Sequence, residues 1–179
     1  MVGTGWIYRL AKSLYSLKSP QFSHCDLVVP LGYGLLNRHE LPDAAKKTLK
    51  EAVQIASKHQ APIAWASSNY FWPGCEDQED RLKMAEANAT GLAALPIIAG
   101  GVTNSVTEAQ SIRRAVMKAR LKLQYNTIVV VADWPHARSV LKIWRKVFSE
   151  SAIVVISIDG QWNESHPAFF QCSELRWLL

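Results

Sequence analysis

The chain's most informative segment is Thr127-Ile-Val-Val-Val-Ala-Asp-Trp-Pro-His-Ala-Arg-Ser-Val-Leu-Lys-Ile-Trp-Arg-Lys-Val-Phe148. It opens with an apolar, largely β-branched run from Ile128 to Ala132, which predicts a strand buried on both faces. Pro135 follows, and proline is tolerated in the first turn of a helix because its missing N–H costs nothing there. Apolar residues then recur at helical spacing. The segment therefore predicts a strand that leads directly into a helix.

The same alternation extends over most of the chain. Apolar runs predict further strands over residues 24–31, 63–66, 95–99 and 152–158. Helices are predicted from Pro42 to about residue 59, over residues 79–90 with Leu82, Ala85 and Ala89 inward, and from Ser105. Ser105 and Glu108 fit a capping box. Residues 70–78 are predicted as a loop and 170–179 as a final helix.

This order of elements predicts an α/β fold: a Rossmann-like three-layer sandwich, with a mainly parallel sheet of about five strands and helices on both faces. At 179 residues the chain has the length of one ordinary domain. We expect an N-terminal segment over residues 1–24, followed by a single α/β domain over residues 25–179.

Composition argues against several classes of protein. The net charge of +5 is mild and spread over several predicted helices, and no nucleic-acid-binding motif is present, so no nucleic-acid partner is expected. The cysteines Cys25, Cys75 and Cys172 lie far apart without C-x-x-C or Cys/His ligand spacing. They favour free thiols over a disulfide framework or a metal site.

The N-terminal residues 1–20 mix apolar side chains such as Trp6, Leu10 and Leu14 with basic ones. They lack the apolar core of a signal peptide and are too polar to span a bilayer. An amphipathic helix is expected here, which packs on its own domain or contacts a membrane surface. The expected location is the cytoplasm, with membrane association as the alternative.

In a parallel sheet the strand carboxyl ends share one edge, and ligands bind beyond it. His136 and Asp133 are the candidate catalytic residues there, with His136 as acid or base near neutral pH. Arg138 could clamp a phosphate or carboxylate, and backbone N–H groups at glycine turns favour anions. The pocket is therefore predicted to suit a small anionic molecule. The candidate ligand-binding residues are Gly32, Tyr33, Gly34, Ser67, Ser68, Asn69, Gly100, Gly101, Thr103, Asn104 and Arg138.

Structural explanations compete with each of these roles. Gly32-x-Gly34 is not a dinucleotide fingerprint, because Asn37 stands where a third glycine is required. Ser67 and Ser68 lack a G-x-S-x-G elbow, so a nucleophile is not indicated. Asp133 would also serve as a helix cap. The residues leave open whether the protein is an enzyme, and the argument for a site is the convergence of these groups on one edge.

Three segments carry a family resemblance: Asp26-Leu-Val-Val-Pro-Leu-Gly-Tyr-Gly34, Pro96-Ile-Ile-Ala-Gly-Gly-Val-Thr-Asn-Ser-Val-Thr-Glu-Ala109 and Val129-Val-Val-Ala-Asp-Trp-Pro-His-Ala-Arg-Ser139. Their order resembles the YdcF/SanA/ElyC-like family of bacterial proteins. The chain departs from that pattern at Ser68-Asn69, where two glycines are usual, and at His136-Ala-Arg138, where two residues usually separate histidine and arginine. The resemblance implies a Rossmann-like domain linked to envelope biogenesis, and to S-adenosylmethionine in one cytoplasmic member.

Three functional hypotheses follow. The first is a protein that binds, or acts on, a nucleotide-like or phosphorylated envelope precursor of peptidoglycan or lipid-carrier metabolism. The second is a non-catalytic scaffold or sensor in envelope homeostasis, which contacts a protein partner or a membrane surface through its N-terminal segment or the loop from Tyr70 to Cys75. The third is an S-adenosylmethionine-binding protein, although the chain lacks the glycine turn and acidic strand end of the usual methyltransferases. The cofactor stays open between S-adenosylmethionine, a nucleotide and none.

Overall fold

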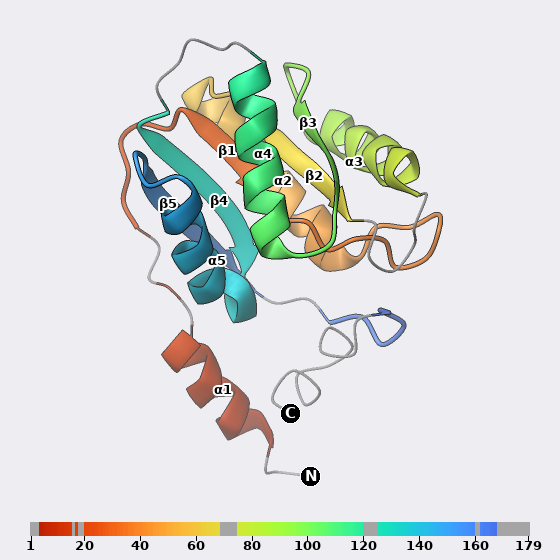
Figure 1. Cartoon of the computed structure of the whole chain (residues 1–179). Coiled ribbons are helices and arrows are strands. Elements are labelled where there is room, and N and C mark those ends of the chain that lie inside the picture. The colour runs from red at the N-terminus through yellow and green to blue at the C-terminus, as the bar shows by residue number, and fades with distance from the viewer. Residues whose placement is uncertain are drawn as a thin grey trace.

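The computed structural model describes residues 4–15, 17, 20–68, 75–119, 125–159 and 162–167 (Figure 1). Strands and helices alternate after an N-terminal helix, as the sequence predicted. In chain order they are α1 Thr4–Tyr15, β1 Leu27–Pro30, α2 Asp43–His59, β2 Ala64–Ser68, α3 Glu76–Thr90, β3 Ile97–Val102, α4 Ser105–Lys118, β4 Thr127–Asp133, α5 Trp134–Val147 and β5 Ala152–Ile158.

All the pairings between these strands are parallel. One sheet has the order β1-β4-β5 and the other pairs β2 with β3. A parallel bridge between Val28 and Ile63 joins the two sheets, and the Val28 N–H donates to the Pro62 carbonyl at 3.0 Å. The strands therefore follow the spatial order β3-β2-β1-β4-β5. The direction of winding reverses between β1 and β4, and this switch point is where doubly wound sheets bind ligands.

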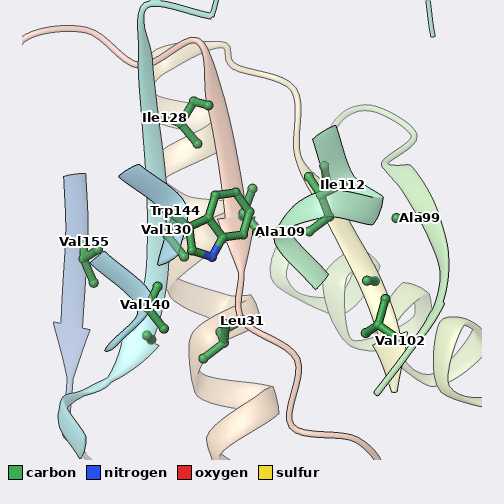
Figure 2. Close-up of a cluster of buried hydrophobic side chains, with 14 of the residues drawn as sticks. Leu31, Ala99, Val102, Ala109, Ile112, Ile128, Val130, Val140, Trp144 and Val155 are labelled. Atoms are coloured by element: carbon green, nitrogen blue, oxygen red, sulfur yellow. The ribbon is translucent and has the colours of Figure 1, made fainter. Parts of the chain in front are cut away.

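Helices cover both faces of this sheet, so the prediction of a Rossmann-like three-layer sandwich is confirmed (Figure 1). On one face, a cluster joins Val130 of β4 with Ile112 of α4 and Trp144 of α5 (Figure 2). Val29 of β1 belongs to the same cluster. The other face buries a second cluster beneath α2 and α3, made up chiefly of Val28, Leu49, Val53, Trp65, Ala87 and Val129. Successive residues of one strand thus enter opposite clusters, which is why the strands are continuously apolar.

The inward face predicted for the helix α3 was only partly right: Leu82 packs against the core, but the two alanines do not. Ala85 and Ala89 are exposed, whereas Glu79, Lys83 and Ala87 are buried. The physical reason is that Glu79 and Lys83 bond to each other and to the backbone at the carboxyl end of β2. The helix also begins at Glu76, inside the predicted loop, and residues 69–74 lie outside the described part of the chain, as does the predicted final helix.

The cap of α4 lies one residue earlier than predicted. Asn104 is the N-cap residue, and its side-chain oxygen accepts the N–H groups of Val106 at 3.0 Å and Thr107 at 2.9 Å. The hydroxyl of Thr107 accepts the Asn104 N–H at 3.1 Å and completes the capping box. Glu108 is therefore not needed for capping, and its carboxylate enters the protein interior.

The N-terminal helix α1 lies against α5, and Lys12 forms an ion pair with Asp159 at the end of β5. Within α1, Ala11 is buried, whereas Trp6, Leu10 and Leu14 are exposed. Among the described helices, none has both the length and the apolar character needed to cross a bilayer.

Candidate functional site

A hydrogen-bonded pair joins the carboxyl ends of β1 and β4 at the switch point. The Tyr33 hydroxyl donates to Oδ1 of Asp133 at 2.7 Å and accepts the Asp133 N–H at 2.8 Å. Both side chains are buried. Burial raises the pKa of Tyr33 well above its ordinary value, and the neighbouring Asp133 carboxylate raises it further. Tyr33 is therefore a neutral donor that fixes the Asp133 carboxylate.

His136 lies in the first turn of α5 and completes this cluster. Its Nδ1 is 2.7 Å from Oδ1 of Asp133, and its ring meets the Tyr33 ring edge-on with centroids 6.0 Å apart. Burial disfavours the charged imidazolium, but the Asp133 charge and hydrogen bond, and the charge of Glu108, outweigh it and raise the pKa of His136. With 26% of its side chain exposed, His136 reaches the surface, and its buried partner Asp133 favours the protonated imidazolium.

Glu108 brings a second acid to the same edge. Its Oε1 accepts the Gly32 N–H at 2.7 Å, just after β1. Burial raises the pKa of Glu108 to about 7; the Gly32 hydrogen bond and the Lys83 charge oppose this rise, and Glu79 adds to it. Glu108 therefore titrates near neutral pH, although its side chain is buried and its Oε1 is occupied by Gly32.

Polar side chains of α3 bond to one another and to the carboxyl end of β2. Glu79 Oε2 accepts the Ser68 N–H at 2.8 Å, and its Oε1 lies 2.7 Å from the Lys83 ammonium group. Lys83 also donates to the Ala66 carbonyl. The buried Ser67 hydroxyl donates to Asp80, which accepts a second bond from the Trp65 indole at 3.1 Å. The predicted role of Ser67 and Ser68 in ligand binding stays a prediction.

The remaining predicted residues are spread along the edge. Gly34 has a φ of 69°, the left-handed conformation that glycine adopts without strain. Thr103 and Asn104 form the exposed cap of α4, and Arg138 is exposed one turn into α5. Gly100 and Gly101 lie within β3, the outermost strand of the sheet, and line a separate hollow of about 390 Å³. Asn69 lies outside the described residues.

The structure adds four residues that the sequence analysis did not place in the site: Glu79, Lys83, Glu108 and His166. His166 is buried, and its Nε2 lies 3.2 Å from the Tyr33 carbonyl oxygen. A signal for Glu108 existed, because it precedes Ile112 by four residues and so shares the inward face of α4. His166 follows the last strand in an irregular segment, where no periodicity could have indicated its contact.

Cys25 is not a reactive centre, and no metal centre forms in the described part of the chain. Cys25 is buried, its thiol donates to the Leu27 carbonyl at 3.2 Å, and burial raises its pKa to about 11. Such a thiol is a poor nucleophile. Among the described residues, no three His, Cys, Asp or Glu side chains gather closely enough to hold a metal ion.

The sheet order and the polar cluster at its switch point define a Rossmann-like α/β protein. No family model and no curated protein matches the chain. A solved structure described as a universal stress protein in complex with cAMP matches with 18% sequence identity and a TM-score of 0.48. The match covers 76% of this chain and 98% of that chain, and at this identity it concerns the fold alone.

The expected membership of the YdcF/SanA/ElyC-like family was wrong. No family model supports it, and a solved structure that matches is described as a universal stress protein. The physical reason lies in the three segments that carried the resemblance. They consist of buried strands, a glycine turn and helix starts, which doubly wound α/β sheets share whatever their family. The envelope role implied by that resemblance loses its support as well.

Proposed function

We propose that this protein binds a small phosphorylated molecule of the nucleotide class at the carboxyl edge between β1 and β4. The observation that carries the proposal is the pair formed by His136 and Asp133, 2.7 Å apart at the switch point of the sheet. Ligands of doubly wound folds bind at this place. A partly exposed histidine there, held in a fixed orientation by a carboxylate that raises its pKa, can donate a hydrogen bond to a phosphate and, when protonated, adds a positive charge.

Charge at this edge favours an anion although several acids lie nearby. Asp133 is bonded to Tyr33 and His136, Glu79 to Lys83 and Ser68, and Glu108 to Gly32. Each of these acids thus has at least one partner within the protein. The N-termini of α4 and α5 add partial positive charge at the same edge, and such termini favour phosphate groups.

A thermal-shift and calorimetric panel tests the proposal on the full chain. It contains nucleotides including cAMP, nucleotide sugars, isoprenoid phosphates and S-adenosylmethionine, the cofactor alternative raised by the sequence. A ligand at about a hundred times its Kd stabilises the native state by roughly 2.7 kcal/mol. Binding should be lost in His136→Gln and weakened in Asp133→Asn.

His24→Gln is the matched control. His24 also bonds to an aspartate, with Nε2 2.6 Å from Oδ1 of Asp26, but it precedes β1 at the opposite edge of the sheet. The control breaks the same kind of histidine–aspartate pair at a place remote from the proposed site, so ligand binding should persist. Unchanged binding in His136→Gln, or no shift with any member of the panel, would contradict the proposal.

A second candidate function is association with an anionic membrane surface through α1. Trp6, Leu10 and Leu14 recur every four residues and are 62%, 50% and 56% exposed, and Arg9 is exposed on the same helix. An apolar stripe beside basic side chains is typical of helices that lie in the membrane interface. This role requires no catalysis and fits a scaffold or sensor.

Sedimentation with phosphatidylserine and phosphatidylcholine vesicles separates this function from ligand binding. The variant Leu10→Glu with Leu14→Glu should stay in the supernatant but keep its ligand. Leu95→Glu is the control, because Leu95 is 87% exposed outside α1. If the α1 variant sediments like the unmodified chain, the membrane function is excluded.

A further inference from the structure

A groove of about 800 Å³ lies between α4 and α5. These helices lie next to each other on one face of the sheet (Figure 1). Val106 of α4 and Ile143 and Val147 of α5 supply apolar lining. Val106 is 45% exposed, so the groove leaves unburied apolar surface. Apolar surface gathered in a hollow is typical of a site that another molecule covers.

Basic side chains surround this apolar lining. Arg113 and Arg114 of α4 face the groove with Lys142 and Lys146 of α5. In sequence α4 carries three basic residues and α5 carries four, against a single acidic residue, the buried Glu108. Beyond the two helices, Glu150 pairs with Arg113 at 3.1 Å. The groove is therefore strongly positive as well as apolar.

The groove is separate from the candidate ligand site. Neither Tyr33, Asp133 nor His136 lines it, and its residues on α5 come from the half of the helix remote from His136. Its occupant must match both an apolar strip and basic side chains along a channel between two helices. An amphipathic helix whose apolar face is flanked by carboxylates has this combination, and helices recognise grooves in this way. Nucleic acid would match the charge but leave the apolar lining unused.

We propose that the groove between α4 and α5 is a docking site for an acidic, amphipathic helix of a partner protein. Leucine-type side chains of the partner contact Val106, Ile143 and Val147. Its carboxylates pair with Arg114, Lys142 and Lys146. The charges guide the encounter and set specificity, and the apolar contacts supply most of the stability.

The test uses the full chain and a synthetic helical peptide of about 18 residues, or five turns, with leucines at helical spacing and glutamates on the flanks. Binding is followed by fluorescence anisotropy of the labelled peptide. The variant Lys142→Glu with Lys146→Glu should weaken binding at least about tenfold, as expected for reversed charges at an interface. Lys47→Glu with Lys50→Glu, on exposed positions of α2 across the sheet, makes the same charge change and should leave binding intact.

Three comparisons decide whether the apolar lining and the partner class are right. Val106→Asn should weaken binding without a change in charge, and thermal unfolding verifies that each variant is folded. A scrambled peptide of the same composition should bind poorly. Equal binding of the scrambled peptide, or equal loss in the α2 variant, would overturn the proposal. Preferential binding of duplex DNA or phosphatidylserine vesicles, lost in the α5 variant, would assign the groove to another class of partner and overturn it too.

Discussion

The hydroxyl of Tyr33 and the carboxylate of Asp133 lie 100 residues apart in sequence and 2.7 Å apart in the structure. The Asp133 N–H returns a hydrogen bond of 2.8 Å to the same hydroxyl oxygen. These two bonds join the turn after β1 to the start of α5. Because His136 bonds to the same carboxylate oxygen, the position of the proposed ligand-binding histidine depends on Tyr33.

Replacing Tyr33 by phenylalanine should lower the free energy of unfolding by about 1–3 kcal/mol, because buried polar groups of Asp133 lose their partner. Urea unfolding measures the change. Tyr125→Phe is the matched control, since the buried Tyr125 hydroxyl has no hydrogen-bond partner among the described residues. That variant should be neutral or slightly stabilising. Equal losses in both would contradict the role given to the Tyr33 hydroxyl.

Stability should fall as the pH rises from about 4.5 to about 7, because of Glu108. Its pKa is raised by burial from 4.5 to about 7, so the native state holds a proton that the unfolded chain has released. The stabilisation is complete below the unfolded pKa and lost as the pH rises through the folded pKa; it amounts to about 3 kcal/mol. The pKa of His136 is also raised, and it contributes a change of the same sign at higher pH.

Urea titrations across this pH window measure the effect. Glu108→Gln keeps an oxygen for the Gly32 N–H but cannot ionise. In this variant the free energy of unfolding should therefore fall much less between pH 4.5 and 7. Glu164→Gln alters an exposed carboxylate and serves as the control. An unchanged slope in Glu108→Gln would show that this carboxyl is not the group that titrates.

Gly32→Ala should destabilise the protein, whereas Gly100→Ala should not. A Cβ at Gly32 would lie 3.0 Å from Oε1 of Glu108 and 3.5 Å from the Ala66 carbonyl oxygen, so the buried carboxylate must shift. A Cβ at Gly100 meets no atom within 4 Å. We expect a loss of about 1–3 kcal/mol at Gly32, typical of overpacking, and comparison of the two Tm values measures it. Equal Tm values would show that Glu108 adjusts without cost.

The fold was predictable because its decisive features are local. The run from Ile128 to Ala132 is apolar at every position, short and mostly β-branched, which favours a strand covered on both faces. Because the strands are parallel, their carboxyl ends lie at the same edge of the sheet. The sequence alone therefore assigns Tyr33, Asp133 and His136 to that edge. Their mutual hydrogen bonds could not be predicted in this way, since they depend on the register of β1 against β4.

Glu79, Lys83 and Glu108 were not predicted as site residues. Their burial depends on which face of each helix turns inward and on partners that are distant in sequence. A cap at Asn104 instead of Ser105 leaves Glu108 out of the capping box and free to bond to Gly32, 76 residues earlier in sequence. Lys83 was not expected in the interior, because isolated lysines are almost never buried. Its burial follows from Glu79 and the Ala66 carbonyl oxygen, and no periodicity encodes that arrangement.

The buried pair of Glu79 and Lys83 yields the largest expected change in stability. Their side chains are 0% and 5% exposed, and the atoms of the pair are 2.7 Å apart. Lys83→Met leaves the Glu79 charge buried without its cation, which costs about 3–5 kcal/mol in comparable pairs. The double variant Glu79→Gln with Lys83→Met should recover part of that loss, because no charge is then left uncompensated.

Breaking the solvent-exposed pair of Arg113 and Glu150 with Glu150→Ala should cost at most about 1 kcal/mol. If Lys83→Met were no more costly than Glu150→Ala, the Glu79 carboxyl would be protonated or hydrated in the variant, and the ion pair would not be a major source of stability.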